Sequence, residues 1–131
     1  AYLCVPEAIQ FLGSLLPGGW FELMEKNRSL ALFARQLLCE ALAVSPPCPD
    51  EMIGSMAVVP LPEKLSLSEQ PGRTREWPLL QEILFDRFNI EVPIIPWHEP
   101  FQQMVRVSAQ LYNTPEQYKY LAKGLLALLS N

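Results

Sequence analysis

Arg106 is the residue of this sequence whose type and setting best suit chemistry. It lies in a run in which two sets of side chains alternate: Val105, Val107, Ala109 and Leu111 with Met104, Arg106, Ser108 and Gln110. Alternate side chains of a β-strand point to opposite faces, so we expect the first set to be buried and Arg106 to stand on the other face. A guanidinium held on a strand can bind a carboxylate through two parallel hydrogen bonds. The run predicts a site for an acidic small molecule, and a structural ion pair is the alternative.

Two polar residues near Arg106 are weaker candidates for the same site. Ser108 would share the face of Arg106 and could orient it, whereas Asn113 is expected in the following turn, where its side chain can bond to nearby backbone. His98 is the single histidine and the one proton-transfer candidate near neutral pH. A lone histidine without a partner is more often a surface or hairpin residue, so we assign no catalytic residue in this sequence.

Four stretches have the pattern of helices, at about residues 6–16, 20–43, 78–88 and 115–129. Thr114 and Gln117 have the spacing of a capping box at the start of the last helix. We expect an apolar stripe on the long second helix, made of Phe21, Met24, Leu30, Phe33, Leu37, Leu38, Ala41 and Leu42, with charged residues such as Arg35 mostly on its other faces. The expected buried stripe of the last helix is Tyr118, Leu121, Ala122, Leu125, Leu126 and Leu129.

Three stretches have the pattern of strands. Residues 52–59 form a nearly continuous apolar run, which predicts a strand covered on both faces. Residues 91–98 contain prolines that confine them to an edge strand, and the third strand carries Arg106. Residues 63–76 read as a surface loop. The sequence therefore predicts an α+β fold, with a small antiparallel or mixed three-stranded sheet and helices packed mainly on one face.

The second helix would be about 36 Å long at 1.5 Å per residue, which suits a connector between two domains. We therefore divide the chain into a helical connector at 1–43, leading from a missing large domain, and an α+β small domain at 44–131. The sequence does not begin with methionine, and its first residues enter a helix directly. We expect it to be one domain of a longer polypeptide, with exposed apolar side chains near Phe21 and Met24 where the large domain is missing.

Composition limits the partners. The net charge is −4 with no basic run, which argues against nucleic acid. No apolar run reaches the length of a membrane span, and no secretory signal is recognised, so no membrane partner is expected. Cys4, Cys39 and Cys48 have neither zinc-site nor disulfide spacing. They are expected to be apolar packing residues in a reduced, cytoplasmic protein without a bound metal.

The run Arg-Val-Ser-Ala-Gln-Leu-Tyr-Asn-Thr-Pro-Glu at 106–116, with the aliphatic helix after it, resembles the C-terminal signature of the class V aminotransferase family. These are fold-type I pyridoxal-phosphate enzymes and include cysteine desulfurases and isopenicillin N epimerase. The N-terminal half adds to the likeness, because Gly18-Gly19-Trp20, Asn27–Ala31 and Ala34–Leu38 are similar to the helix that leaves the large domain in the epimerase-like branch. The resemblance covers nearly the whole chain.

The resemblance implies the C-terminal small domain of such an enzyme, with Arg106 binding the α-carboxylate of an amino-acid substrate. It further implies a homodimeric parent whose pyridoxal phosphate is held by the large domain. No lysine here stands in a sequence like the family's Schiff-base motif, so this segment by itself should bind no cofactor and should not catalyse.

Epimerisation at Cα is the activity we favour for the parent, and a cysteine desulfurase or lyase reaction is the alternative. A stand-alone α+β module that binds an acidic ligand or a protein is the alternative from another class.

Overall fold

A computed structural model describes residues 2–65, 79–97 and 103–130 of the chain. In chain order the helices are α1 (Val5–Ser14), α2 (Gly19–Leu42), α3 (Leu79–Phe88) and α4 (Pro115–Leu129), with short 3-10 turns at Tyr2–Cys4 and Asp50–Met52. The strands are β1 (Met56–Pro60), β2 (Ile94–Pro96) and β3 (Gln103–Ser108). These elements agree in kind and order with those predicted from the sequence.

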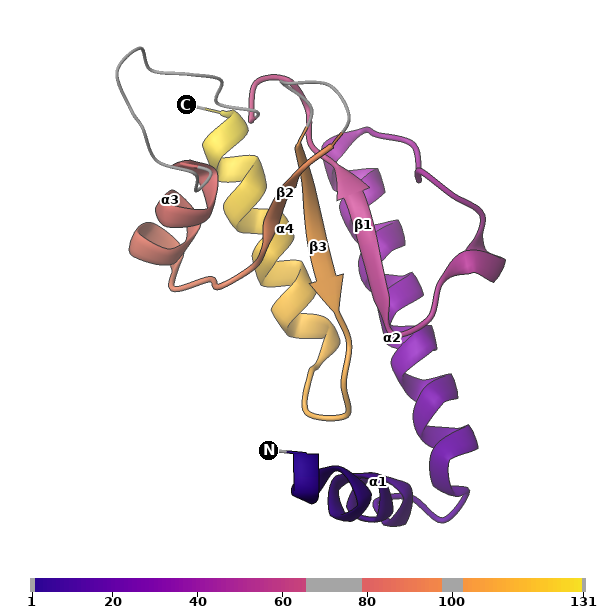
Figure 1. The fold of residues 1–131 in the computed structure, drawn as a ribbon. Coiled ribbons are helices and arrows are strands. Elements are labelled where there is room, and N and C mark those ends of the chain that lie inside the picture. The colour runs from indigo at the N-terminus through magenta and orange to yellow at the C-terminus, as the bar shows by residue number, and fades with distance from the viewer. Residues whose placement is uncertain (1, 66–78, 98–102, 131) are drawn as a thin grey trace.

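The three strands form an antiparallel sheet in the order β1-β3-β2, so the strand that carries Arg106 is central and β2 is an edge strand, as its prolines predict. Helices α2 and α4 lie side by side on the same face of this sheet, and α3 lies beyond α4 (Figure 1). The predicted α+β class and the one-sided covering by helices are therefore confirmed.

Local chemistry accounts for the ends of the two long helices. Helix α2 stops where Ala43 takes a left-handed conformation with φ of 54°, and the proline-rich segment after it cannot continue the helical hydrogen bonds. Helix α4 starts with the predicted capping box, in which the side chains of Thr114 and Gln117 each accept a hydrogen bond from the other residue's backbone N–H. These are the two helices that cover one face of the sheet.

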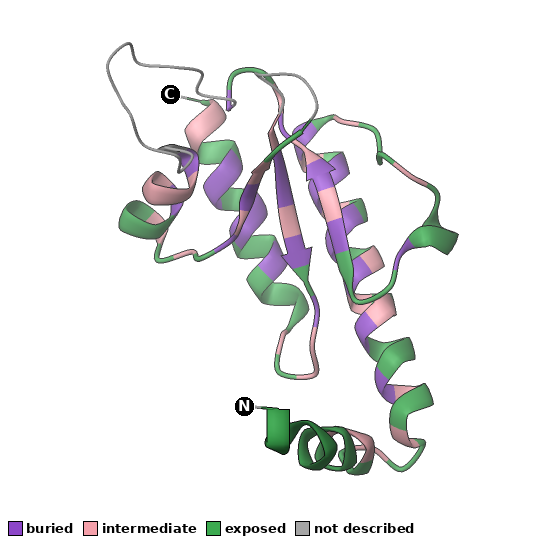
Figure 2. Cartoon of the chain, in the orientation of Figure 1, coloured by how far each residue is buried: buried purple, intermediate pink, exposed green. Residues whose placement is uncertain are grey.

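The core lies between the sheet and the pair α2 and α4, as the buried positions in Figure 2 show. Its most completely buried side chains are Leu38, Val59, Leu65, Leu80, Leu84, Val105 and Leu125. On β3, Val105 and Val107 are buried in this core and Arg106 is not, as the predicted alternation requires, but Met104 is buried too and Leu111 is half-buried in the turn beyond the strand. Burial of side chains of this size contributes about 1.5–3 kcal/mol each, so the strand is fixed by its apolar face.

The prediction of a first strand covered on both faces is wrong for this structure. The strand begins only at Met56, because residues up to Met52 form a 3-10 turn, and its burial alternates. Ala57 and Val59 are buried against the helices, while Met56 is 55% exposed and Val58 is half-buried. The reason is that helices cover one face of the sheet, and no described element covers the other face fully.

The buried stripe of α2 also differs from the prediction. It consists of Leu23, Asn27, Ala31, Ala34, Arg35, Leu38, Cys39 and Leu42, so Phe21, Met24 and Phe33 lie outside it. Apolar residues occur on several sides of this helix, and contact with β1 and α4 decides which side is buried. Arg35, expected on an outer face, is instead 4% exposed. In α4 the predicted stripe holds except that Leu126 is 39% exposed and Leu129 only half-buried.

Helix α1 has no buried residue, and Phe21 and Met24 are 74% and 56% exposed. The expected exposure of apolar side chains in this region is thus observed. Cys4 is exposed, contrary to the expected packing role, whereas Cys39 is buried. His98 and nearly all of the predicted loop at 63–76 lie outside the described residues. Within the described ranges, no helix has the length and apolar character to cross a membrane.

Candidate functional site

The backbone of Arg106 is fixed on both sides. Arg106 pairs with Val58 of β1 in antiparallel register, and its N–H donates to the carbonyl oxygen of Pro93 at 3.0 Å. Both contacts are independent of the arginine side chain, since they are made by the main chain. The backbone of Arg106 therefore keeps its place in the sheet whether or not the side chain has a binding partner.

The side chain of Arg106 is half-buried, and its Nε atom is fully buried without a hydrogen-bond partner. No residue in the described part of the chain forms an ion pair or hydrogen bond with this guanidinium. A buried donor without an acceptor costs about 1–3 kcal/mol, which makes it rare unless a ligand or a further protein surface supplies the acceptor. No acidic residue in the described part of the chain thus forms the structural ion pair with Arg106. This favours the interpretation that Arg106 binds a ligand.

One cavity of about 370 Å³ brings the three predicted site residues together: Arg106, Ser108 and Asn113 all line it. It lies where the segment at 89–93, just before β2 begins, runs beside β3. Its other wall belongs to α4, and its remaining lining residues include Glu91, Gln117, Tyr118 and Tyr120. The cavity is large enough to hold part of a small molecule.

Ser108 and Asn113 make hydrogen bonds that hold the wall of this cavity in place. Ser108 is exposed, and its carbonyl oxygen accepts a hydrogen bond from the Tyr118 hydroxyl at 2.9 Å. No hydrogen bond between the Ser108 hydroxyl and Arg106 occurs among the described residues. Asn113 lies in the turn before α4, as predicted, where its Oδ1 accepts from the backbone N–H of Gln110 at 3.0 Å.

Sequence reasoning missed the site role of Tyr118, which it assigned only to the core stripe of α4. Its side chain is buried and its hydroxyl ties α4 to the end of β3. Burial raises the pKa of the Tyr118 hydroxyl, and nearby Tyr112 raises it further, so this group stays a neutral donor. The hydrogen bond between buried Asn27 and half-buried Gln110 was missed as well, although a lone asparagine among apolar positions of a helix was a signal available in the sequence.

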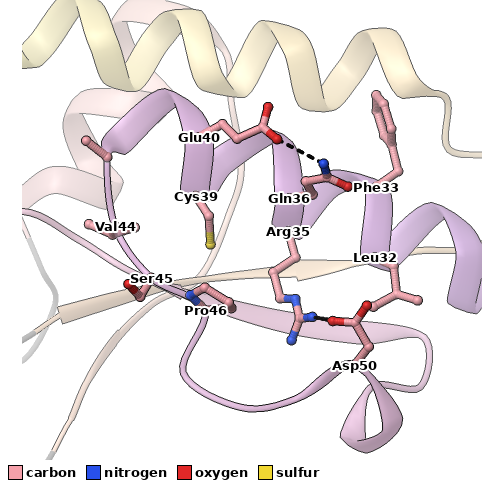
Figure 3. A pocket seen from close by; sticks show the side chains of 11 residues that line it. Leu32, Phe33, Arg35, Gln36, Cys39, Glu40, Val44, Ser45, Pro46 and Asp50 are labelled. Atoms are coloured by element: carbon pink, nitrogen blue, oxygen red, sulfur yellow. Dashed lines mark hydrogen bonds and ion pairs between the residues drawn. The ribbon is translucent and has the colours of Figure 1, made fainter.

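A second cavity, of about 770 Å³, lies between α2 and the segment that follows it (Figure 3). Arg35 lines this cavity and forms an ion pair with Asp50, while Nη1 of Arg35 donates to the carbonyl oxygen of Cys48 at 2.8 Å. Arg28 supports the same segment by donating to the carbonyl oxygens of Asp50 and Ile53. These arginines are satisfied by protein groups, so they hold the segment that leads into β1.

The described residues do not fit a pyridoxal-phosphate site. Lys26 and Lys119 are exposed and paired with Glu22 and Glu116, and the other two lysines of the chain, Lys64 and Lys123, are exposed too. Neither of the two cavities is lined by a lysine. The lysine that forms the Schiff base with this cofactor is thus not among the residues that line either cavity.

The fold and the Arg106 cavity together define a small α+β domain whose central strand carries an arginine side chain with no partner among residues 2–65, 79–97 and 103–130. No protein-family model matches the chain. Over 97–98% of its length it is 30% identical to a probable chloroplastic L-cysteine desulfhydrase of Arabidopsis thaliana and 33% identical to an isopenicillin N epimerase of Amycolatopsis lactamdurans. It is 28% identical to a putative L-cysteine desulfhydrase of Oryza sativa subsp. japonica.

The homologues of this chain are thus class V aminotransferase-like enzymes that use pyridoxal phosphate, which confirms the resemblance stated from the sequence. The chain spans 27–29% of the length of these three relatives.

Proposed function

We propose that this chain is the small C-terminal domain of a pyridoxal-phosphate enzyme that acts on an amino acid, and that Arg106 binds the α-carboxylate of the substrate. The observation that carries the proposal is the half-buried Arg106 side chain, whose Nε has no partner in the described structure. A substrate carboxylate would supply the missing acceptor through a charge-assisted hydrogen bond. The similarity to L-cysteine desulfhydrases and isopenicillin N epimerases supports a substrate of this class.

The connector role of residues 1–43 is part of this proposal. Helix α1 buries none of its residues, and the exposed apolar side chains continue onto the start of α2. An apolar surface of this kind is typical of a protein interface. A large domain packed here would cover this surface.

Pyridoxal phosphate, bound by that large domain, would supply the electron sink for bond breaking at Cα. This chain would contribute the orientation of the substrate, because a bidentate guanidinium fixes the plane of the carboxylate. Both an epimerase and a desulfhydrase need that contact. Epimerisation remains the prediction from the sequence, and so do a homodimeric parent and a cytoplasmic location.

The test is to replace Arg106 in the complete enzyme and to measure turnover of L-cysteine and of isopenicillin N. Arg106→Lys keeps the charge but loses the bidentate geometry, and Arg106→Ala loses both. Charged hydrogen bonds contribute about 1.5–3 kcal/mol, so kcat/KM should fall by about ten- to a hundredfold for Ala. Cofactor absorbance should not change. Normal turnover combined with a large loss of stability would assign Arg106 a structural role instead.

A further inference from the structure

Asn27 is a buried polar residue on the apolar side of α2. It is 4% exposed and follows Leu23 along a stripe that continues with Ala31 and Ala34. Its Nδ2 donates to the side-chain oxygen of Gln110 at 2.9 Å, across 83 positions of sequence. Its Oδ1 is buried and has no partner. A buried amide oxygen without a partner costs free energy of folding, which sets Asn27 apart from the apolar residues of the same stripe.

The bond from Asn27 reaches the turn that follows the Arg106 strand. The Oε1 atom of Gln110 accepts from Asn27 and also from the backbone N–H of Leu111 at 2.9 Å. The backbone N–H of Gln110 in turn donates to Oδ1 of Asn113 at 3.0 Å. Gln110 is thereby held at its side chain and at its main chain, and the turn at 110–113 is tied to α2.

The chain of hydrogen bonds ends in the wall of the Arg106 cavity. Asn113 Nδ2 donates to Oε1 of Gln117 at 3.2 Å, and the same oxygen accepts from the backbone N–H of Thr114. Both Asn113 and Gln117 line the cavity together with Arg106. A continuous chain of hydrogen bonds therefore runs from the buried face of α2, through the turn, to two residues that line the same cavity as the arginine.

We propose that Asn27 is a positioning residue for the carboxylate site: it holds Gln110, and through Gln110 it fixes the turn that places Asn113 and Gln117 in the wall of the cavity that Arg106 also lines. The inference rests on the proposed function of Arg106. Side chains that shape a binding site need a supporting layer of bonded groups, since small displacements weaken binding. Asn27 is in contact with this support and not with the cavity itself.

The experiment compares four variants of the complete enzyme: Asn27→Ala, Gln110→Ala, Gln110→Glu and the Asn27→Ala/Gln110→Ala double variant. Gln36→Ala is the matched control, because Gln36 lies exposed on the same helix and its side chain donates to Glu40, one turn further along that helix. We expect the two single alanine variants to raise KM for L-cysteine or isopenicillin N by about five- to tenfold, with little change in kcat. The double variant should lose no more than either single one, because both remove the same bond.

Gln110→Glu keeps an acceptor for both Asn27 and Leu111 and should retain nearly normal KM. Hydrogen exchange provides a readout apart from activity, and Asn27→Ala should speed exchange of the backbone amides at 110–114 while Gln36→Ala should not. A KM that stays normal in Asn27→Ala, or additive effects in the double variant, would overturn the positioning role even if the Arg106 variants lose binding. If the Arg106 variants keep normal KM, the proposed function fails, and hydrogen exchange still decides whether Asn27 holds the turn.

Discussion

Val58 and Arg106 lie directly opposite each other on neighbouring antiparallel strands. Residues paired in this way have side chains on the same face of the sheet, so the arginine stands beside a half-buried valine on the face away from α2 and α4. Val59 and Val105, paired one position away, are both fully buried on the opposite face. The pleat of the sheet thus directs Arg106 and the core valines to opposite faces, while the cavity that Arg106 lines also has Val107 and residues of α4 in its wall.

Arg106→Leu in this 131-residue chain should keep or raise the free energy of unfolding. The described structure gives the guanidinium no ion pair, and leucine removes the unpartnered Nε while keeping apolar contact. We expect the free energy of unfolding, measured in urea, to stay the same or to rise by up to about 1 kcal/mol, whereas replacing a structural arginine would lower it. A loss above about 3 kcal/mol would show that Arg106 is a structural ion-pair partner.

Arg35→Leu should destabilise the same chain by about 1–3 kcal/mol. The substitution leaves the carbonyl oxygen of Cys48 without its donor and Asp50 without its ion-pair partner. Lys26→Ala is the control, because Lys26 pairs with Glu22 on the surface of the same helix, and exposed pairs of this kind contribute little to stability. Equal losses in the two variants, measured by urea unfolding, would contradict the assigned role of Arg35.

The exposed apolar surface of α1 and early α2 should bind the dye ANS and promote self-association of this chain. Phe21→Glu combined with Met24→Lys should reduce both effects with little change in stability, because the two side chains are 74% and 56% exposed. Phe85→Glu is the matched control, since Phe85 is 55% exposed on α3 and lies outside this surface. Equal effects from the control, by fluorescence and sedimentation, would remove this support for a covering domain.

Cys39 should resist thiol reagents that modify Cys4. Cys4 is exposed, whereas Cys39 is 7% exposed and burial raises the pKa of its thiol, so less of the reactive thiolate forms. Reaction with an aromatic disulfide at pH 8 should label Cys4 quickly and Cys39 only in urea, with Cys39→Ser identifying its signal. Rapid labelling of Cys39 in the folded chain would contradict the packing of α2 on the sheet.

The same thiol has a defined effect on stability. A raised pKa means that folded Cys39 keeps its proton above pH 9.0, the usual value, where the unfolded chain releases it. The contribution of this thiol to the free energy of unfolding is therefore fully present at neutral pH and is lost as the pH rises above about 9. Cys39→Ala should make the unfolding free energy less sensitive to pH in that range, and an unchanged slope would argue against the burial effect.

The sequence by itself determined the kinds of element, the one-residue alternation around Arg106 and the capping box of Thr114 and Gln117. These features depend on neighbours a few residues apart, and the periods of strand and helix express them directly. The candidate site residues Arg106, Ser108 and Asn113 could be named in advance for the same reason, because they lie within eight positions of one another.

Only the tertiary structure decided which face of α2 is buried, that Arg35 pairs with Asp50, and that Asn27 reaches Gln110 across 83 positions. The helix has apolar residues on several sides, so its periodicity permits more than one buried stripe. Contacts with β1 and α4 select one of them, and those contacts join segments that are far apart in the chain. Whether the guanidinium of Arg106 has a partner depends on the same three-dimensional neighbours, which is why the sequence left the ion pair and the ligand as alternatives.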